Sequence, residues 1–385
     1  MNISTKMKNQ LLSQSPPTDL FNSRHFENVK LPCEEAKTLP SWCYTSDKWY
    51  NKEVEKIILP SWHFVGHISE LENIGDYKTI DFQKYKLLII KGKDNVIRAF
   101  HNSCRHRGSK LLKEHGNCKS IRCCYHSWNY AIDGTLTSAP YMENIKKEEN
   151  GLLNIHCQVA QGLIFINLND NPIPLEEYLG DFIENIKPYS LEQMTCVKTK
   201  EYTLDSNWKL YIEVDMETYH TPHIHTHSIG KQLVEDVIGS GDWVSVYHPS
   251  ERTVALAPED RTKGFPHISG LYGRAAKGIF FTVIFPGFFI VTAQDSMWWI
   301  HKIPEGPEKT KVKIGYCFPK ETTNRSDFKE KAELYFRRWD QVIDEDNWIT
   351  EFQQEAIRSS IPGHYSHLES VVHKLDNWII ERVID

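Results

Sequence analysis

The chain has 385 residues, which is enough for two domains that each bury a core of their own. Its composition, 40% hydrophobic and 25% charged, is that of a globular protein, and a net charge of -6 with a pI of about 6.3 argues against a nucleic-acid partner. No run approaches the roughly 18 apolar residues of a membrane helix, and residues 1–30 lack the pattern of a secretory signal, so we expect a cytoplasmic protein with no membrane partner.

The first part of the chain predicts a polar arm followed by an antiparallel β domain. Residues 1–44 are polar and have little apolar periodicity, which indicates an arm. After Trp62 the pattern changes to short β-type runs separated by turn signals such as Asp133-Gly134. The expected runs are Leu87–Ile90, Val96–Phe100, Tyr130–Thr137 with its central turn, and Leu163–Leu168. We therefore expect an all-β domain over residues 45–168.

A polar, proline-containing break at residues 169–174 begins a second domain, which we expect over residues 169–385. The expected strands are Trp243–Tyr247, Thr253–Leu256, Ile279–Phe285, Phe288–Thr292, Met297–Ile303 and Thr310–Phe318. The expected helices are Leu175–Ile186, a stretch after Trp208 that ends near His225, Phe328–Arg358 and Val371–Val383. An antiparallel sheet packed on one side by long helices makes the whole chain α+β, with a helix-grip second domain.

Two mixed pairs of cysteine and histidine form the first candidate site. Cys104 and His106 are spaced C-x-H, and sixteen residues later Cys123 and His126 are spaced C-x-x-H. Two thiolates can hold one iron of a [2Fe–2S] cluster while two neutral imidazoles hold the other. Replacing two anionic thiolates by neutral nitrogen makes the reduced state easier to reach. The site therefore predicts an acceptor of electrons from a separate reductase.

Two alternatives stay open at this first site. Cys124 could replace Cys123, which would change the second spacing to C-x-H. A zinc site with two cysteines and two histidines usually keeps the cysteines in one pair and the histidines in the other, so the mixed pairs favour the cluster. We interpret Cys118 and His115 as loop residues without a ligand role.

Two histidines and a distant acid form the second candidate site. His220 and His225 are about one helical turn apart, with a break at Pro222. Mononuclear Fe(II) that activates O2 favours two histidines and one carboxylate on one face, which leaves positions open for O2 and a substrate. His223 and His227 are alternatives, and we interpret both as surface histidines.

The carboxylate has to come from elsewhere in the chain, and Asp346 is the best candidate. It lies in an expected helix that otherwise carries apolar residues at helical spacing. Asp344 and Glu345 compete with it, but residues one or two apart do not share a helix face, so at most one of the three points into a site. The alternative is that all three form a solvated acidic run.

With these residues the chain resembles the large (alpha) subunits of Rieske non-haem iron oxygenases, over roughly residues 38–385. The matching motifs are C-x-H-R-G at 104–108, C-x-x-H-x-W at 123–128, and N-W-K followed by E-x-x-x-E-x-Y-H-x-x-x-x-H over 207–225. The resemblance implies a homotrimer in which the cluster of one subunit faces the iron of its neighbour. It also implies that Glu217 bridges the two centres, accepting hydrogen bonds from His220 and from His126 of the partner subunit. The alternative for Glu217 is an ordinary surface glutamate.

Within this family, a glutamate at position 217 is closer to the choline, glycine betaine and carnitine oxygenases than to the naphthalene type. Thr38-Leu39-Pro40 and the region 44–62 also resemble that branch. Relatives usually carry asparagine where this chain has Val214, which bears on the substrate assignment.

The implied activity is O2-dependent hydroxylation or N-demethylation of a small substrate such as a quaternary ammonium compound. Electrons would come from NAD(P)H through a separate reductase. Cations of this type prefer aromatic cages, but each strand aromatic is more readily explained as sheet core; these are Phe281, Phe285, Phe289, Trp298 and Trp299. Hydroxylation of an aromatic ring or another carboxylated substrate is the second hypothesis. A pure electron carrier, the third, would leave the second site without a role.

Overall fold

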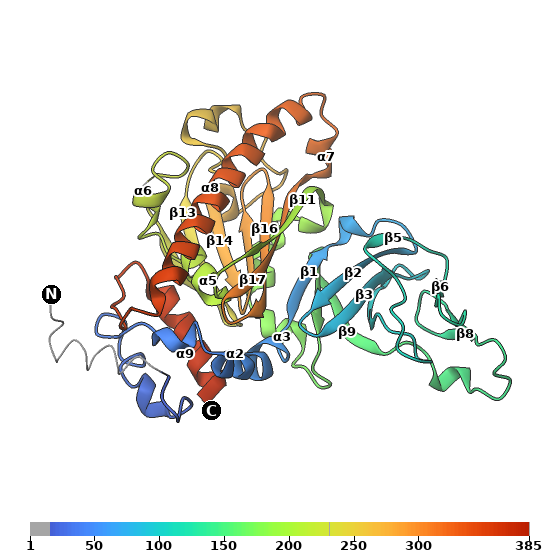
Figure 1. Cartoon of the computed structure of the whole chain (residues 1–385). Helices are drawn as coiled ribbons and strands as arrows, with labels where there is room; N and C mark the ends of the chain where they lie inside the picture. The colour runs from blue at the N-terminus through green and yellow to red at the C-terminus, as the bar shows by residue number, and fades with distance from the viewer. Residues whose placement is uncertain (1–15, 231, 385) are drawn as a thin grey trace. The chain divides into compact units, whose positions relative to one another are not determined.

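The computed structural model describes residues 16–230 and 232–384, and these form two compact units (Figure 1). One unit consists of residues 61–175. The other combines residues 16–60 with residues 176–384. The expected arm, residues 1–44, lies partly outside the described residues, and its described part contains η1 (Ser23–Phe26) and η2 (Ser41–Cys43). Phe26 and Trp42 pack with Trp49, so this part of the chain contributes buried aromatic surface.

The unit of residues 61–175 is built from antiparallel strands, as expected. A seven-stranded sheet has the order β1-β10-β9-β4-β3-β2-β5, and a small sheet has the order β6-β7-β8. The large sheet consists of β1 (His63–His67), β2 (Asp76–Phe82), β3 (Tyr85–Lys91), β4 (Ile97–His101), β5 (His115–Asn117), β9 (Asn154–Ala160) and β10 (Leu163–Asn167). The small sheet consists of β6 (Ile121–Arg122), β7 (Asn129–Tyr130) and β8 (Leu136–Ser138).

The hairpins predicted from turn residues are confirmed in this unit. β3 and β4 pair with Ile89 opposite Ala99, and Asn95 adopts φ 63° in the connecting turn. Gly134, between β7 and β8, has φ 90°, and a Cβ there would lie 2.5 Å from the ring of Phe100. The turn therefore needs glycine for both its backbone conformation and its close approach to the core.

The second unit contains a seven-stranded antiparallel sheet with the order β11-β17-β16-β15-β14-β13-β12. Its strands are β11 (Met194–Leu204), β12 (Glu235–Ile238), β13 (Trp243–Pro249), β14 (Gly278–Ile284), β15 (Phe288–Thr292), β16 (Met297–Gly306) and β17 (Lys309–Pro319). Five of these strands were predicted. β11 and β12 were not, because their side chains are mostly polar and half exposed at the sheet edges.

The predicted strand Thr253–Leu256 is wrong. These residues form an irregular segment, although all four side chains are buried. The hydroxyl of Thr253 donates to Asp295 at 2.8 Å, so a side-chain contact fixes the segment in place of a strand partner. A short run of apolar residues indicates that a segment is buried. It does not show that the segment pairs as a strand, and this one is buried without a strand partner in the described structure.

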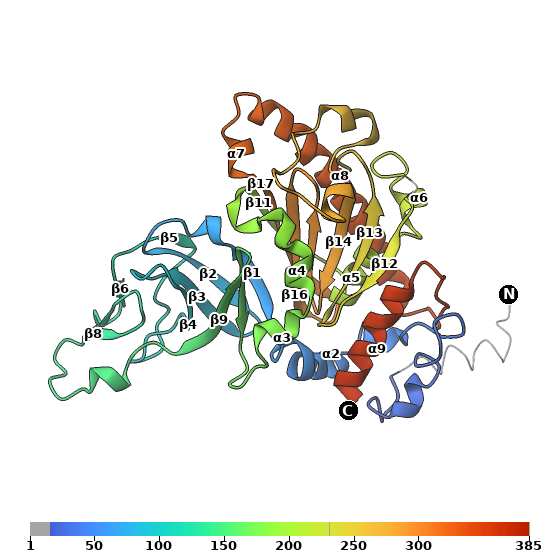
Figure 2. The same cartoon turned by 180° about the vertical axis from the view of Figure 1, so that it is seen from behind.

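Helices cover both faces of this sheet. α5 (Trp208–Met216) and α8 (Phe328–Ile357) lie on one face, and α8 crosses the sheet along its full length (Figure 1). α3 (Leu175–Leu179) and α4 (Phe182–Ile186) lie on the other face (Figure 2), where Phe182 contacts the ring of Trp243. The remaining helices are α2 (Asp47–Glu53), α6 (Thr221–Ile224), α7 (Lys320–Thr323) and α9 (Ser370–Ile384). Among the described residues, no helix is long and apolar enough to cross a membrane.

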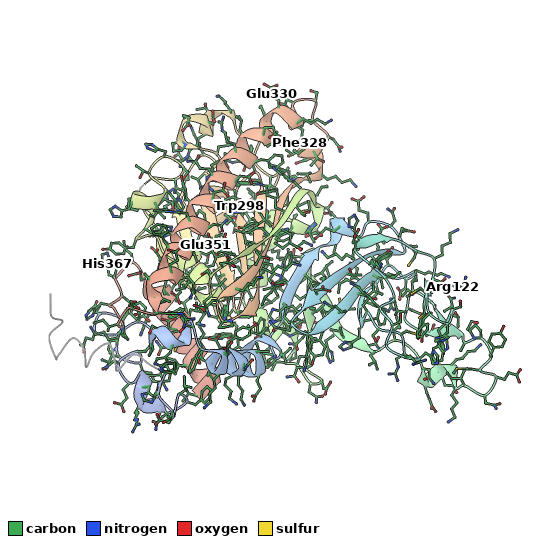
Figure 3. The ribbon with its side chains drawn as sticks, in the orientation of Figure 1. Arg122, Trp298, Phe328, Glu330, Glu351 and His367 are labelled. Atoms are coloured by element: carbon green, nitrogen blue, oxygen red, sulfur yellow. The ribbon has the colours of Figure 1, made fainter. Side chains whose placement is uncertain are left out.

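The strand alternation decides which side chains meet α5 and α8. Phe281 on β14 is paired with Val291 on β15, which is paired with Trp298 on β16, so the three project to the same face. Trp298 lies where α8 crosses the sheet (Figure 3). On α8, the buried positions recur every three or four residues, and two of them, Arg338 and Asp346, are charged. The sheet and α8 thus enclose polar groups as well as an apolar core.

Candidate metal and cluster sites

The N-W-K motif anchors the start of α5. Asn207 is the N-cap residue, and its side-chain oxygen accepts from the backbone N–H of Lys209 at 3.0 Å. The ammonium of Lys209 donates to Glu53 of α2 at 2.7 Å, and both side chains are fully buried. The indole N–H groups of Trp208 and Trp49 also donate to Glu53, at 3.1 and 2.8 Å. This network fixes the helix that leads into the histidine segment.

Glu217 shapes the turn between α5 and α6. One carboxylate oxygen accepts from the backbone N–H of His220 at 3.0 Å, and the other contacts Nδ1 of the same residue. Glu217 has extended backbone angles and ends α5, and Pro222 stands in the first turn of α6. The chain therefore bends at Glu217, which directs Nε2 of His220 away from this carboxylate.

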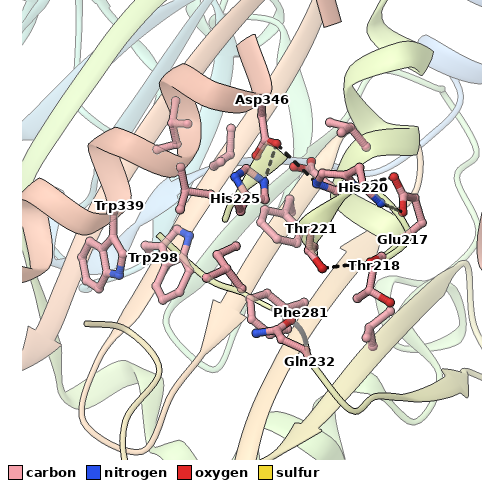
Figure 4. A pocket seen from close by; sticks show the side chains of 18 of the residues that line it. Glu217, Thr218, His220, Thr221, His225, Gln232, Phe281, Trp298, Trp339 and Asp346 are labelled. Carbon is pink, nitrogen blue, oxygen red and sulfur yellow. Dashed lines mark hydrogen bonds and ion pairs between the residues drawn. The ribbon is translucent and has the colours of Figure 1, made fainter. Parts of the chain in front are cut away.

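His220, His225 and Asp346 converge on one point. One nitrogen from each ring and one carboxylate oxygen all lie within 4.8 Å of one another. Oδ1 of Asp346 lies 2.9 Å from Nε2 of His225 and 3.6 Å from Nε2 of His220. Figure 4 shows Asp346 reaching from α8 towards both imidazoles.

A second carboxylate orients His225. Glu345 accepts at 2.6 Å from Nδ1 of His225 and at 2.5 Å from the hydroxyl of Ser228. Both histidines thus present Nε2 to Asp346 and bond a glutamate through Nδ1. Carboxylates in this position fix the tautomer and increase the basicity of a metal-ligating imidazole. Sequence reasoning considered Glu345 only as a competitor of Asp346 and missed this orienting position, for which the sequence holds no signal.

The three groups fit a divalent metal ion. Oδ1 of Asp346 is buried yet makes no hydrogen bond of good geometry, so it is directed at the space between the donors. Burial lowers the pKa of His220, but Asp346 and Glu217 outweigh burial and raise that pKa to about 9. Burial raises the pKa of Asp346, but both imidazoles outweigh it and lower that pKa to about 2. The site therefore favours positive charge, and two histidines with one carboxylate are the donor set of non-haem Fe(II).

A cavity of about 60 Å³ adjoins these three groups (Figure 4). The apolar part of its lining is Val214, Ile229, Val246, Phe281, Phe289, Trp298, Ile300, Trp339, Val342 and Ile343. The charged groups Asp215 and Arg338 also line it. Asp215 is ion-paired with Lys302, which is fully buried and lies over the rings of Tyr211 and Phe289.

The other candidate groups of this region lie elsewhere. His223 and His227 are exposed, and so is Asp344. Asp344 is two residues before Asp346 on α8, and residues two apart do not share a helix face, so its side chain is directed away from the site.

Two loops of matching geometry bring the cysteine–histidine pairs together. In the first, the N–H of Cys104 donates to the carbonyl of Ser109 and the N–H of Gly108 donates back to Cys104, at 2.8 and 2.9 Å. In the second, the N–H of Cys123 donates to Trp128 and the N–H of Ser127 donates back to Cys123, at 2.8 and 3.1 Å. The fourth residue after each cysteine, Gly108 or Ser127, has a positive φ. By this correspondence Cys123, not Cys124, is the counterpart of Cys104.

The donor atoms of these loops separate by type. Cys104 and Cys123 are buried in the core, and a hydrogen bond at 3.3 Å joins the Cys104 thiol to the Tyr130 hydroxyl. The rings of His106 and His126 are 4.7 Å apart, and His126 is exposed. Backbone N–H groups of Tyr125 and His126 outweigh burial and lower the pKa of Cys123. Two buried thiols beside two outer imidazoles fit a cluster whose irons have different ligands.

Three neighbouring candidates have other surroundings. Cys124 is exposed, and its sulfur lies 3.9 Å from the hydroxyl of Ser109. His115 is exposed on β5, and Cys118 is half buried beyond the end of that strand.

Comparison with known proteins places both units in a family. Residues 191–384 match the ring hydroxylating alpha subunit (catalytic domain), and residues 61–149 match the Rieske [2Fe-2S] domain. The chain belongs to the ring-hydroxylating alpha subunit family. Its Rieske domain binds a [2Fe–2S] cluster and its catalytic domain binds mononuclear iron, and the predicted α+β fold of the family is confirmed.

Two curated relatives of this ring-hydroxylating alpha subunit are informative. The 2-aminobenzenesulfonate 2,3-dioxygenase subunit alpha of Alcaligenes sp is 35% identical over 185 residues, 46% of this chain and 47% of that protein. The carnitine monooxygenase oxygenase subunit of Acinetobacter baumannii is 34% identical over 202 residues, 49% of this chain and 53% of that protein. The matched part of this chain thus spans about half the length of these relatives.

The ring-hydroxylating alpha subunit also shares its fold with solved structures. A quaternary ammonium Rieske monooxygenase superposes with a TM-score of 0.79 at 23% identity, covering 92% of this chain and 99% of that chain. A naphthalene 1,2-dioxygenase superposes with a TM-score of 0.78 at 18% identity, covering 94% of this chain and 95% of that chain. Enzymes with different substrates thus share the fold, so the substrate has to be argued from the cavity.

Proposed function

We propose that this chain is the oxygenase component of a two-component Rieske system that hydroxylates or N-demethylates a small substrate. The observation that carries the proposal is the convergence of His220, His225 and Asp346 beside an apolar cavity. In this proposal these three residues hold the mononuclear iron. The cluster ligands are Cys104, His106, Cys123 and His126. Glu217 is the positioning carboxylate between the two centres.

The reaction consumes O2, two electrons and two protons. One oxygen atom enters a C–H bond of the substrate, and the other leaves as water. An iron ion held by the three residues would supply the O2 chemistry. Hydroxylation of an N-methyl carbon gives a hemiaminal, which loses formaldehyde and leaves the demethylated amine.

The protein's own groups prepare the site for this reaction. Glu217 and Glu345 hold the Nδ1 proton of each imidazole, which keeps the Nε2 lone pairs free for a metal. The apolar lining excludes bulk water, and a charged ligand set is stronger in such surroundings than in water. Asp346 supplies the negative charge that offsets a divalent ion.

The partners in this proposal are O2, a small-molecule substrate, a separate reductase that draws electrons from NAD(P)H, and two further copies of the chain in a homotrimer. The exposed imidazole edge of His126 supports electron exchange across a subunit contact. Cluster ligation needs reduced thiols, which supports a cytoplasmic location. Light scattering of the holoprotein tests the trimer, and a monomer at working concentration would contradict it.

The substrate class has support on two sides. Carnitine, choline and glycine betaine oxygenase subunits are among the relatives, and the cavity carries the aromatic side chains of Phe281, Phe289, Trp298 and Trp339, which suit an N-methylated cation. Relatives named for 2-aminobenzenesulfonate and salicylate favour the second candidate, hydroxylation of an aromatic ring. Release of formaldehyde during turnover identifies N-demethylation, and substrate-dependent O2 uptake with the aromatic acids but not with the N-methylated compounds identifies the second candidate.

The test begins with anaerobically reconstituted holoprotein. A Rieske cluster and one mononuclear iron give about three irons per chain, whereas a pure electron carrier gives two. A surrogate reductase and a panel of carnitine, choline, glycine betaine, salicylate and 2-aminobenzenesulfonate are then scored for O2 uptake and formaldehyde. A protein with two irons per chain, or one without substrate-dependent O2 uptake, would contradict the proposal.

A further inference from the structure

The cavity is lined by a buried cation that is ion-paired with no carboxylate among the residues that the structure describes. Arg338 of α8 is 2% exposed and lines the cavity. Its Nε and Nη2 atoms make no hydrogen bond to any residue that the structure describes. The guanidinium lies over the ring of Trp298 at 5.5 Å, which fixes its plane and leaves its N–H edge for another group.

The carboxylates around Arg338 are already engaged. Asp346 faces the two imidazoles, and Glu345 bonds His225 and Ser228. Asp260, near the same end of α8, is ion-paired with Arg337 and Lys263. None of these carboxylates is ion-paired with Arg338 within the described part of the chain.

A second arginine makes the local charge more positive. Arg261, in the short helix η8 (Pro258–Lys263), is half buried, and its Nε atom also has no partner among the described residues. Burial and the charge of Arg261 outweigh the opposing charges of Asp346 and Glu345 and lower the pKa of Arg338 to about 9. The buried Lys302 makes a contrast, because Asp215 neutralises it within the protein.

A buried guanidinium without a counter-ion is costly to fold. Carboxylates and other oxyanions match its planar fork with two parallel hydrogen bonds. We propose that Arg338 binds the anionic group of the substrate, so that this enzyme acts on small molecules bearing a carboxylate or sulfonate. The inference rests on the proposed oxygenase function and narrows its substrate class.

Arg338 and Asp346 come from different turns of α8. Arg338 and Asp346 are eight residues apart on α8, which is about 12 Å of helix. Both side chains are on the buried stripe, with Ile343 between them. In this proposal the anionic group binds Arg338 while the carbon to be oxidised lies next to the two histidines, which line the same cavity. A zwitterion such as carnitine and an aromatic acid both satisfy this arrangement, whereas choline does not.

The test measures binding to the holoprotein by calorimetry, without reductant. Three matched pairs serve as probes: carnitine and choline, salicylate and salicylamide, and 2-aminobenzenesulfonate and its sulfonamide. We expect at least one anion to bind about 30-fold or more tightly than its partner, and Arg338→Gln to remove that preference. Arg358→Gln, at the C-terminal cap of the same helix, 59% exposed and paired with Glu308, should leave this preference unchanged.

A thermal melt separates binding from a structural role. Because Arg338 has no counter-ion, Arg338→Gln should melt at or above the temperature of the unsubstituted protein when no ligand is present. A lower melting temperature, an unchanged preference in the variant, or a holoprotein with intact cluster and iron signals that binds none of the three anions would overturn the inference. Missing iron signals or missing O2 uptake with every substrate would instead count against the oxygenase function.

Discussion

At the scale of single residues, the metal site depends on two glutamates that do not touch the metal position. Glu217 bonds Nδ1 of His220, and Glu345 bonds Nδ1 of His225. Each glutamate thereby decides which ring nitrogen carries the proton and where the other nitrogen points. The two carboxylates come from different elements, the end of α5 and the middle of α8, so the ring of His220 is oriented within its own segment, whereas the ring of His225 is oriented only when α8 is in place.

Glu345→Gln should weaken iron binding by about 10- to 100-fold, because the amide holds the Nδ1 proton of His225 less strongly than a carboxylate does. Competition with a calibrated chelator measures the affinity. Asp344→Asn, which changes the adjacent exposed acid, is the matched control and should bind iron normally. Equal affinities in the two variants would mean that Glu345 has no role at the site.

Glu217→Gln, reconstituted with enough iron to fill both centres, should slow product formation by at least about 100-fold, because the proposal places this carboxylate between the cluster and the mononuclear iron. Iron content, the Rieske resonance signal and the rate of cluster reoxidation with substrate and O2 check this expectation. Reoxidation at the normal rate would argue that electrons do not pass this residue.

Glu213 should make stability depend on pH. Burial raises its pKa to about 7, against the opposing effects of the Tyr44 hydroxyl and Lys209. This folded-state pKa is above the unfolded value of about 4.3, so between these two pH values the folded state binds more protons than the unfolded state. The contribution of Glu213 to the free energy of unfolding is therefore complete below the unfolded pKa and is lost as the pH rises through the folded pKa of about 7. The free energy of unfolding of Glu213→Gln, taken relative to that of the unsubstituted protein, should therefore rise by up to about 3 kcal/mol when the pH is raised from 5 to 8.

Urea unfolding at the two pH values measures this difference. Glu201→Gln, on the edge strand β11 with a side chain 50% exposed, is the control and should show no comparable change. A Glu213→Gln variant whose stability relative to the unsubstituted protein is the same at both pH values would contradict the assignment of a shifted carboxyl.

At the scale of elements, α5 and α8 contribute different parts of the site: α5 leads into the histidine segment, and α8 supplies the acidic and basic side chains. α5 is held at its start by the Asn207 cap and by the buried pair of Lys209 and Glu53. α8 supplies Asp346, Glu345 and Arg338 from three positions of one continuous helix. Asp346, Glu345 and Arg338 are therefore fixed on the surface of one helix, which favours a fixed geometry, whereas His220 and His225 flank the short helix α6.

Lys209→Met should destabilise the unit by about 3–5 kcal/mol, because the Glu53 carboxylate loses the cation that is paired with it in the described part of the chain and yet stays buried. Lys311→Met removes one partner of an exposed pair, Lys311 and Glu201 at 2.6 Å, and should cost less than about 1 kcal/mol. Urea midpoints compare the two. Similar losses of stability in the two variants would show that burial of the Lys209–Glu53 pair does not increase its contribution to stability.

At the scale of the whole molecule, the sequence predicts the parts that depend on periodicity or on short-range spacing. α8 follows from its repeat of buried positions, and the hairpins follow from their turn residues. The Cys104 and Cys123 motifs are local in the chain, and each forms a loop of its own. These are features for which a few neighbouring residues decide the structure.

The remainder depends on contacts between distant parts of the chain. Thr253–Leu256 reads as a strand because it is buried, but its burial comes from an irregular segment. Glu345 reaches His225 across 120 positions of sequence, and the missing partner of Arg338 is visible only when every neighbouring carboxylate has been placed. Such relations are properties of packing, which residue patterns alone do not report.

The order in which the chain is made adds a constraint. Glu53 and Lys209, which pair in the interior of one unit, are 156 positions apart, and all of residues 61–175 lie between them in the sequence. During synthesis residues 16–60 leave the ribosome long before α5, the helix that contains Lys209. The aromatic side chains of this segment, including Trp42 and Trp49, therefore lack part of their packing partners while the intervening β unit is synthesised. We therefore expect chaperones to bind mainly residues 16–60 during expression.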